Sequence, residues 1–502
     1  MGDGRIPVRL TRRLLLGALM GSAAGAALAK APVRSLRPPP RDPDPDSRIM
    51  MPAGDLIAAA GLSGKVGCMV ADAKTGEVLE ARSPLLCLPP ASVAKALTAV
   101  YALDALGPAH RFRTRLLATG PVKNGFIQGD LVLVGGGDPT LDTDALGDMA
   151  RQLKAAGVRG VTGAFQVFAG ALPAILEIDP SQPKHVGYNP AVSGLNLNYN
   201  RVHFEWKQEP GGYAVSMDAR ARKYSPGVTT SRMRVVDRTG PVYTYADAGG
   251  ADEWTVARPA LGQGGARWLP VRKPEAYTSE VFQILARSHG ILLPDAEYAG
   301  VVPRGETLVE RESEDLREIL RGMLLWSTNL TAEVAGLTAS VARGLKAPSL
   351  ADSAGEMSLW ANRELGARRA ALVDHSGLGE MSRMCADDMV RVLLKARELG
   401  DLPGLMKSIP MLDEAGEVLA DHPVKVWAKT GTLNFVSALA GYITAKGGRE
   451  LAFAYFSADL EQRAAIDPAQ GEVPPGTRAW KGRSRALQMR LIERWGSVFG
   501  AA

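Results

Sequence analysis

Three apolar segments near the C-terminal end of the chain limit its possible folds more than any other feature. The first alternates, with Val424, Val426 and Ala428 leading to "KTGT", and the runs "VSALAGYIT" and "LAFAYFSA" follow it. Apolar runs of this kind, separated by short turns, predict an antiparallel meander of three strands. Lys429 and Gly431 stand at the end of the first strand, where a glycine on an exposed edge allows another backbone to approach. This strand end is therefore a candidate substrate site.

The tripeptide Lys-Thr-Gly occurs a second time, beginning at Lys74 in "ADAKTGEVLEA". This copy lies between two predicted strands, near 66–71 and 78–82, and acidic residues flank it. Such a segment predicts a hairpin turn. We therefore assign substrate binding to the copy at Lys429.

A candidate nucleophile precedes a predicted helix in "PPASVAKALTAVYALDALGP". Ser92 and Lys95 are three positions apart, so they project from one face of the first helical turn. A serine hydroxyl needs an adjacent base, and a lysine amine can serve where burial or a nearby cation lowers its pKa. Alone, the pair would be more typical of a helix cap with an exposed lysine. Ser181 and Lys184 have the same spacing, but the proline between them predicts a loop.

A third motif, Ser-x-Asn, occurs once, as Ser327-Thr328-Asn329. Apolar residues at helical spacing predict a helix before it with one buried face, namely Leu316, Ile319, Leu320, Met323 and Leu324. The motif then falls at the end of a packed helix, where a hydroxyl and an amide can point into a cleft. An ordinary polar helix end would look the same.

Composition and missing signatures narrow the function. The chain has 502 residues, 46% of them hydrophobic, so it is long enough for two or more domains. Half of its formal net charge of +6 comes from the first 29 residues, and the remainder is too small to indicate a nucleic-acid partner. Neither His-Glu-x-x-His nor Gly-x-Ser-x-Gly occurs, so zincins and α/β-hydrolases lack their signatures. A Ser-His-Asp triad stays open, because its members need not be adjacent in sequence.

The order Ser-x-x-Lys, Ser-x-Asn, Lys-Thr-Gly along one chain is the motif set of penicillin-binding proteins and class A β-lactamases. Ser92 and Ser327 lie much farther apart than these motifs do in a compact β-lactamase. With "GDLVLVGGGDPTL", "VDHSGLGEMSR" and "AKTGTLNFVSALAGYI", the chain resembles the low-molecular-mass class C penicillin-binding proteins, which are D-alanyl-D-alanine carboxypeptidase/endopeptidases. The resemblance implies a serine-type peptidase, a cell-wall hydrolase that acts on peptidoglycan stem peptides and is inhibited covalently by β-lactam antibiotics.

The resemblance also implies an α+β fold. Its transpeptidase/β-lactamase-like domain would have a five-stranded antiparallel sheet flanked by helices. The strands would be those near 66–71 and 78–82 and the three after residue 423. A large, mainly β insertion would separate the Ser-x-x-Lys and Ser-x-Asn motifs. The expected domains are residues 51–110 and 313–502 for the two parts of the transpeptidase-like domain, and 111–312 for the inserted domain or domains.

Residue roles follow from the same resemblance. The catalytic residues would be Ser92, Lys95, Ser327, Asn329 and Lys429. Ser92 would be acylated, Lys95 would take its proton, and the backbone N–H groups of Ser92 and Thr432 would form the oxyanion hole. The substrate would be bound by Thr430, Gly431, Thr432 and Leu433. Water would then hydrolyse the acyl-enzyme, so neither a metal nor an organic cofactor is expected.

Two alternative functions use the same motifs. A β-lactamase would have to deacylate a β-lactam quickly, and the long insertion argues against it. A non-catalytic wall-binding or antibiotic-sensing protein would not need the nucleophile. Peptide preference is expected to depend on the insertion, where relatives that bind diaminopimelate often have a tryptophan and an aspartate. Here "VGYNPAVSG" has Tyr188 and Asn189 in that region, and we expect both to contact the stem peptide.

The first 29 residues predict export to the periplasm by a cleaved signal peptide. "TRRLLLGALMGSAAGAALAKA" has a basic start, an apolar run and an Ala-Leu-Ala cleavage site. The pair Arg12-Arg13 resembles a twin-arginine signal, with an ordinary Sec signal as the alternative. Residues 30–50 are proline-rich and charged, which predicts an extended or disordered leader.

Three cysteines follow the signal, namely Cys68, Cys87 and Cys385. Cys68 and Cys87 flank a predicted hairpin, and an oxidising compartment would permit a disulfide between them. Two buried thiols are equally compatible with the pattern. Cys385 would stay free in either case.

Overall fold

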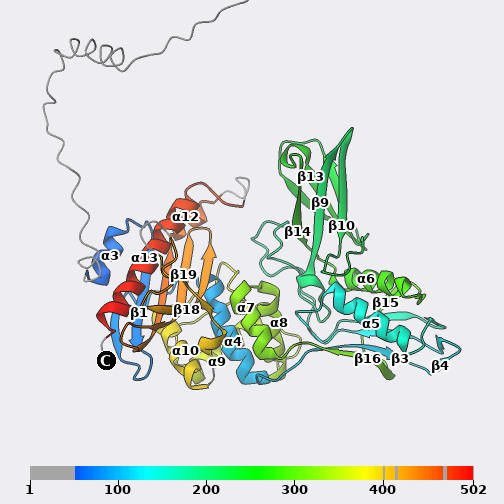
Figure 1. Cartoon of the computed structure of the whole chain (residues 1–502), viewed down its shortest axis with the longest axis horizontal. Helices are drawn as coiled ribbons and strands as arrows, with labels where there is room; N and C mark the ends of the chain where they lie inside the picture. Colours follow the sequence, from blue (N-terminus) through cyan, green and yellow to red (C-terminus); the bar gives the residue numbers. More distant parts are fainter. Residues whose placement is uncertain (1–50, 400–401, 413–416, 467–471, 501–502) are drawn as a thin grey trace, which may run out of the picture. The chain divides into compact units, whose positions relative to one another are not determined.

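Six antiparallel strands form the sheet to which the segment around Lys429 belongs (Figure 1). Their order across the sheet is β17 (Lys407–Ser408), β18 (Lys425–Leu433), β19 (Val436–Thr444), β20 (Glu450–Ala458), β1 (Lys65–Asp72) and β2 (Val78–Arg82). The five predicted strands are all present, and a sixth, the two-residue β17, extends the sheet beside β18. The sequence of β17 has no apolar alternation that could predict it.

The computed structural model describes residues 51–399, 402–412, 417–466 and 472–500, which lie in one compact unit. The predicted signal peptide and leader fall outside the described residues. Across those ranges, no helix is long and apolar enough to cross a membrane.

Helices pack on both faces of the sheet, because alternate residues of each strand point to opposite sides. Val426 and Phe453 belong to one core cluster with residues of the C-terminal helix, whereas Ala440 and Ala454 belong to another. The helices of the first cluster are α3 (Ala53–Ala59) and α13 (Thr477–Val498) (Figure 1). Those of the second are α4 (Ala94–Leu106), α7 (Leu316–Trp326), α8 (Asn329–Ala342), α9 (Leu350–Leu365), α10 (Ala386–Leu399) and the short α11 (Leu402–Leu405). A further short helix, α12 (Leu460–Ala464), follows β20.

The predicted helix before the Ser-x-Asn motif is confirmed as α7. Its predicted apolar residues are all buried, from Leu316 to Leu324. Asp315 caps the N-terminus by accepting from the backbone N–H of Glu318. The helix ends at Ser327, which has a left-handed backbone with φ of +60°. This reversal directs the chain into α8, so the motif lies between two packed helices.

The segment between β3 and β16 is built mainly of strands around its own core cluster. A five-stranded sheet has the order β15 (Ala296–Tyr298), β8 (Phe165–Phe168), β6 (Leu131–Val134), β3 (Arg113–Ala118) and β16 (Glu306–Glu312). Two three-stranded sheets follow, β10 (Gly212–Asp218) with β9 (Arg201–Glu209) and β14 (Gly264–Pro270), and β11 (Ser231–Val236) with β13 (Asp252–Ala257) and β12 (Tyr243–Asp247).

The remaining elements of this segment are short strands and two longer helices. They are β4 (Val122–Lys123), β5 (Phe126–Ile127), β7 (Gly160–Val161), α5 (Thr143–Ala155), α6 (Pro274–Ser288) and the 3-10 turns η2 (Asn198–Asn200) and η3 (Arg258–Ala260). Strand β3 enters the segment, and β16 pairs with it antiparallel before the chain continues to α7. The predicted domain boundaries themselves stay predictions.

Candidate active site

Ser92 and Lys95 meet at the start of α4, as their spacing predicts. Ser92 lies in the 3-10 turn η1 (Ala91–Val93), and the Nζ of Lys95 is 2.9 Å from its Oγ. The same Nζ donates to Asn329 Oδ1 at 2.7 Å and to the carbonyl oxygen of Ser376 at 2.8 Å. An ammonium group has three donors and uses all of them here, whereas a neutral amine could accept the proton of Ser92. The geometry therefore fits Lys95 both as a neutral amine, before it takes the proton, and as an ammonium group afterwards.

The surroundings of Lys95 favour the neutral amine. Its side chain is fully buried. Burial first, and then the charge of Lys429, hold the pKa of Lys95 well below its ordinary value, while the carboxylates of Glu333 and Asp374 oppose the shift. A lowered pKa is what a lysine needs to take a proton from a serine near neutral pH.

The Ser-x-Asn and Lys-Thr-Gly motifs complete the cluster. Lys429 Nζ donates to Ser327 Oγ at 3.0 Å and to the carbonyl oxygen of Thr430 at 2.8 Å. The amide of Asn329 has two partners. Its Oδ1 accepts from Lys95, and its Nδ2 donates to the carbonyl oxygen of Tyr188 at 2.8 Å. Each buried lysine thus contacts one member of the Ser-x-Asn motif, and five residues predicted from three distant motifs come together.

Gly431 lies directly beside the nucleophile segment, and its part in substrate binding stays a prediction. A side chain at this position would meet the backbone of the nucleophile segment, 2.7 Å from the carbonyl oxygen of Pro90 and 3.1 Å from the N of Ser92. The absence of a side chain therefore lets β18 lie directly against Ser92. Ala91, between these two residues, has a φ of +46°, which a non-glycine residue adopts only when its surroundings hold it there.

A cavity of about 950 Å³ opens over Ser92. It is lined by Ser92, Ser327, Asn329, Thr432, Leu433 and Tyr188 together with further residues of the insertion, of the segment 377–380 and of the region after β20. Two of the four predicted binding residues, Thr432 and Leu433, thus face it. Gly431 lies under the serine, and Thr430 contributes its carbonyl oxygen to Lys429.

Two buried carboxylates near the site were not predicted from the sequence. Glu333 is fully buried and accepts from the backbone N–H groups of His375 and Ser376, both at 2.9 Å. Asp374 accepts from those of Gly377, at 2.5 Å, and of Gly379. They shape the loop 374–379, which presents the Ser376 carbonyl oxygen to Lys95.

One sequence signal could have indicated Glu333. It is four residues after Asn329, and is therefore on the same face of α8. It is also the one charged residue of α8. Burial raises the pKa of Glu333, and the charge of Asp374 raises it further.

Glu333→Gln is expected to slow acylation by a β-lactam. An amide has one acceptor oxygen, so its NH₂ group would face a backbone N–H, and the loop that supports Lys95 would shift. A hydrogen bond to a charged group contributes ~1.5–3 kcal/mol, which corresponds to a rate loss of about 10- to 100-fold if it is all lost in the transition state. Stopped-flow labelling with a fluorescent penicillin measures the rate. The exposed Glu364→Gln is the control, and equal rates for the two variants would contradict the role of Glu333.

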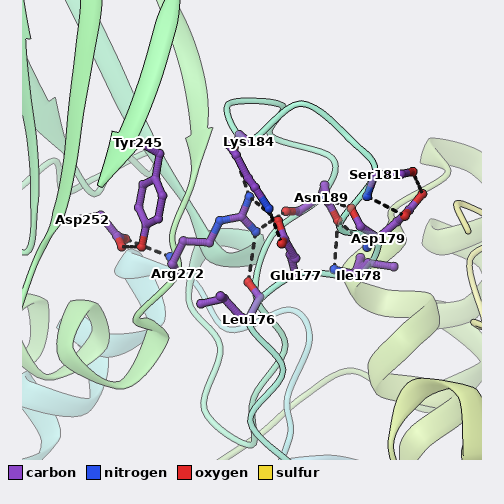
Figure 2. Close-up of polar contacts among 10 residues, drawn as sticks. All are labelled: Leu176, Glu177, Ile178, Asp179, Ser181, Lys184, Asn189, Tyr245, Asp252 and Arg272. Atoms are coloured by element: carbon purple, nitrogen blue, oxygen red, sulfur yellow. Dashed lines mark hydrogen bonds and ion pairs between the residues drawn. The ribbon is translucent and has the colours of Figure 1, made fainter. Parts of the chain in front are cut away.

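The second Ser-x-x-Lys is a loop, as predicted, and its two residues have other partners (Figure 2). Ser181 Oγ donates to Asp179 Oδ2 at 2.9 Å, and Lys184 forms an ion pair with Glu177. Because the lysine is engaged elsewhere, it does not activate the serine. The second Lys-Thr-Gly is likewise a turn, in which Asp72 accepts from the backbone N–H of Lys74.

Arg272 holds the loop 176–189 from inside (Figure 2). Its side chain is 1% exposed and donates to the carbonyl oxygens of Leu176 at 3.0 Å, Lys184 at 2.9 Å and Asn189 at 2.7 Å. Its backbone N–H donates to Asp252 in β13 at 2.8 Å. The loop that places the Tyr188 carbonyl against Asn329 is thus attached to the sheet of β11, β13 and β12.

The expectation that Asn189 contacts a substrate is wrong. Asn189 is fully buried, and its Oδ1 accepts from the backbone N–H groups of Ile178 and Asp179, both at 2.9 Å. It therefore stabilises the loop from within. Tyr188 is 47% exposed and lines the cavity, where its hydroxyl donates to Gln182 Oε1 at 3.3 Å, so its side chain is accessible to a ligand.

One group of metal-ligand type exists among the described residues, and it lies away from the cavity lining. It consists of His203, Glu205 and Asp218, on β9 and β10. The guanidinium of Arg220 is 2.8 Å from Glu205 and 3.0 Å from Asp218, so a protein cation already lies between the two carboxylates.

Comparison with known proteins assigns the chain to a protein family. The profile of the D-Ala-D-Ala carboxypeptidase 3 (S13) family matches residues 55–472. The D-alanyl-D-alanine carboxypeptidase of Actinomadura sp. (strain R39) is 30% identical over 79% of this chain and 78% of its own length. The D-alanyl-D-alanine carboxypeptidase DacB of Haemophilus influenzae is 26% identical over 75% of this chain and 83% of its own.

A solved structure shows the same fold. Penicillin binding protein 4 (dacB) from Haemophilus influenzae superposes with a TM-score of 0.66 at 19% identity, covering 88% of this chain and all of that one. The predicted α+β fold class is thereby confirmed, as are the family resemblance and the predicted class of enzyme. The chain belongs to the D-Ala-D-Ala carboxypeptidase 3 (S13) family, whose members are serine-type carboxypeptidases.

Proposed function

We propose that Ser92 is the nucleophile with which this carboxypeptidase cleaves the terminal D-Ala-D-Ala bond of peptidoglycan stem peptides, and that β-lactams acylate the same serine. We propose endopeptidase action on cross-linked peptides as a second activity of the same site. One observation carries the proposal. The amine of Lys95 lies 2.9 Å from Ser92 Oγ, and burial first, then the charge of Lys429, lowers its pKa.

The reaction would begin when Ser92 Oγ attacks the carbonyl carbon of the penultimate D-alanine and Lys95 takes the hydroxyl proton. The backbone N–H groups of Ser92 and Thr432 would bind the developing oxyanion. The close contact of Gly431 with Ser92 supports this, because it brings the end of β18 beside the serine. Ser327 would then pass a proton to the departing D-alanine, and water would hydrolyse the acyl-enzyme.

Substrate recognition would rest on charge and on shape. Lys429 is buried with its ammonium against Ser327, and it would bind the C-terminal carboxylate of a stem peptide or the carboxylate of a penicillin. Thr432, Leu433 and Tyr188 line the cavity in which the rest of the peptide would lie. A β-lactam complex of penicillin binding protein 4 from Haemophilus influenzae, at 19% identity, supports β-lactam binding by analogy.

We also propose that the enzyme works in the periplasm, where its substrate is located. The basic and apolar pattern of the first 29 residues supports export. A mature protein that begins at Lys30 after secretion from a host cell would support the proposed cleavage site, and an uncleaved chain would contradict it.

The function is tested with purified protein and two substrates. Release of D-alanine from a peptide ending in D-Ala-D-Ala measures carboxypeptidase activity, and cleavage of cross-linked muropeptides measures endopeptidase activity. After labelling with penicillin and digestion with trypsin, mass spectrometry should find the adduct on peptide 83–95, which contains Ser92. It should not find the adduct on peptide 160–184, which contains Ser181. Fast hydrolysis of penicillin without release of D-alanine would indicate a β-lactamase and would contradict the proposal.

The rate of acylation is expected to depend on pH with a bell-shaped profile. Lys95 must be neutral to take a proton, so the rate should rise with pH through its lowered pKa. Lys429 must be charged to bind a carboxylate, so the rate should fall as pH rises through its own pKa. Burial lowers that pKa to about 8, and the charge of Lys407 contributes. Measurement of kcat/KM for penicillin acylation against pH shows both limbs.

Lys407 supplies a control for the basic limb, because it lies on the edge strand β17 and is exposed. Lys407→Ala should move the basic limb to higher pH and leave the acidic limb in place. A basic limb that stays unchanged in this variant would mean that Lys429 is not the group that titrates there.

Tyr188 and Asn189 should separate side-chain recognition from loop position. Tyr188→Ala keeps the carbonyl oxygen that Asn329 contacts, so penicillin acylation should change little while kcat/KM for stem peptides falls. Asn189→Ala loses the bonds that hold the loop, so both rates should fall, by about tenfold for a loss of ~1.4 kcal/mol. Parallel loss of both rates in well-folded Tyr188→Ala, checked by melting temperature, would contradict this division.

A further inference from the structure

Two cysteines face each other beside the segment that carries the nucleophile. Leu88 and Met384 form an antiparallel bridge and exchange both backbone hydrogen bonds, each at 3.0 Å. The residues next to such a pair, on opposite chains, form a non-hydrogen-bonded pair with Cα atoms about 4.5 Å apart. In this register the neighbours are Cys87 and Cys385. Disulfides join Cα atoms about 4.4–6.8 Å apart, so the backbone already has a suitable separation.

The side chains agree with the backbone. Leu88 and Met384 both point into the main core cluster, so the cysteines on either side of them share the opposite face of the ribbon. Both thiols are free in this structure, and the Cys385 thiol is one of the groups that act on the pKa of Cys87, after burial. Burial raises the pKa of Cys87 and, to about 12, that of Cys385. Cys87 is half-buried and Cys385 fully buried.

Cys68 is not placed to compete for either partner. It points from β1 into the cluster formed with α3 and α13. Cys385 directly precedes α10, whose residues belong to the cluster on the other face of the sheet. The fold therefore does not favour the pairing of Cys68 with Cys87 that the sequence left open, and all three cysteines are free in this structure.

We propose that Cys87 and Cys385 form a disulfide when the protein folds in an oxidising compartment, and that this bridge fixes the nucleophile segment against the loop 374–379. Cys87 is five residues before Ser92, and Cys385 follows the loop that presents Ser376 to Lys95. The two segments also touch at Ala91, where a side chain on Gly377 would lie 1.9 Å from the carbonyl oxygen. A disulfide here would hold the segment that carries Ser92 and the loop that contacts Lys95 in fixed positions relative to each other.

The oxidation needs an electron acceptor of the disulfide class, such as oxidised glutathione or a protein disulfide. The thiolate of Cys87 attacks a sulfur of the oxidant, which forms a mixed disulfide and releases one oxidant thiolate. The thiolate of Cys385 then attacks the Cys87 sulfur, which forms the bridge and releases the second oxidant thiolate. Two protons leave the cysteines, and two electrons reduce the oxidant. Because burial raises both pKa values, the exchange should be fast during folding and slow in the folded protein.

Thiol labelling and peptide mapping test the pairing. The full chain is secreted into the periplasm of a host cell, or refolded with reduced and oxidised glutathione, then quenched in acid and labelled with a maleimide under denaturing conditions. We expect one label, on Cys68, without reductant and labels on all three cysteines after reduction. Trypsin without reductant should give peptides 83–95 and 384–391 joined, and peptide 66–74 free.

Matched variants decide between pairings. Cys68→Ala should keep the joined peptides, whereas Cys87→Ser and Cys385→Ser should each lose them. The unreduced protein should melt several degrees higher than the reduced protein, and this gap should disappear in Cys385→Ser. Three labels without reductant from both preparations would overturn the proposal, as would a bridge that contains Cys68. Equal melting temperatures for the oxidised and reduced protein would overturn the claim that the bridge holds the two segments together.

Discussion

Ser92→Ala is expected to abolish labelling by a fluorescent penicillin and release of D-alanine from a D-Ala-D-Ala peptide. Both reactions need a bond to Ser92 Oγ, and among the residues that the structure describes this is the one hydroxyl that hydrogen-bonds with the amine of Lys95. The fold should survive, because the change removes one hydroxyl from a turn that is already tightly packed by β18. Gel fluorescence and D-alanine release measure the two reactions, and an unchanged melting temperature confirms folding.

Ser181→Ala is the matched control, because Ser181 also lines the cavity and also precedes a lysine by three residues. Its hydroxyl donates to Asp179, and Lys184 is paired with Glu177. Labelling and turnover should therefore stay near those of the wild type. Labelling that persists in Ser92→Ala and disappears in Ser181→Ala would transfer the chemistry to the other motif.

The part of the site that local sequence patterns determine was predictable. Ser92 and Lys95 meet because both lie on one turn of a helix, and Ser327 ends a helix whose apolar face can be read from its spacing. The meander that carries Lys429 follows from three apolar runs and short turns. In each case, a local pattern of the sequence determines the geometry. The order of the three motifs along the chain then indicated that they belong to one site.

The contacts that depend on distant partners were not predictable in this way. Glu333 orients a loop about forty residues farther along the chain, and the sequence of its own helix does not indicate which loop it contacts. The sequence around Asn189 is typical of an exposed loop. In the structure this loop surrounds the buried guanidinium of Arg272, which follows β14, and Asn189 is buried with it. The position of Cys87 opposite Cys385 depends on an isolated backbone bridge, Leu88 with Met384, between segments nearly three hundred residues apart.

Gly431 shows a third kind of limit, because its sequence context indicates a close approach but not which segment approaches. A glycine at a strand end predicts close approach of another backbone, and close approach is observed. The approaching backbone is that of the nucleophile segment, however, so the glycine serves the assembly of the site. Sequence alone shows that room is needed, and only the fold shows what fills it.

Lys429→Ala is expected to lower the rate of penicillin acylation by ~10²–10³, because loss of one electrostatic contact in the transition state costs ~2–4 kcal/mol. The change removes the cation proposed to bind the carboxylate and leaves Ser327 Oγ without its ammonium partner. It should also raise the pKa of Lys95, since the charge of Lys429 is the second cause of the low value. The acidic limb of the pH–rate profile should therefore move to higher pH.

The second effect separates a role in the site from a general loss of affinity. If Lys429 bound the carboxylate and did nothing else, saturating penicillin would restore the rate and the acidic limb would stay in place. Lys74→Ala is the control from the other Lys-Thr-Gly, because Lys74 is exposed in a turn whose backbone Asp72 holds. It should keep the rate and the pH profile of the wild type. Equal losses in the two variants would mean that the wrong copy of the motif was assigned to the substrate. A lower rate at limiting penicillin together with a shifted acidic limb, both in Lys429→Ala alone, would support both roles of this lysine, in binding the carboxylate and in keeping Lys95 neutral.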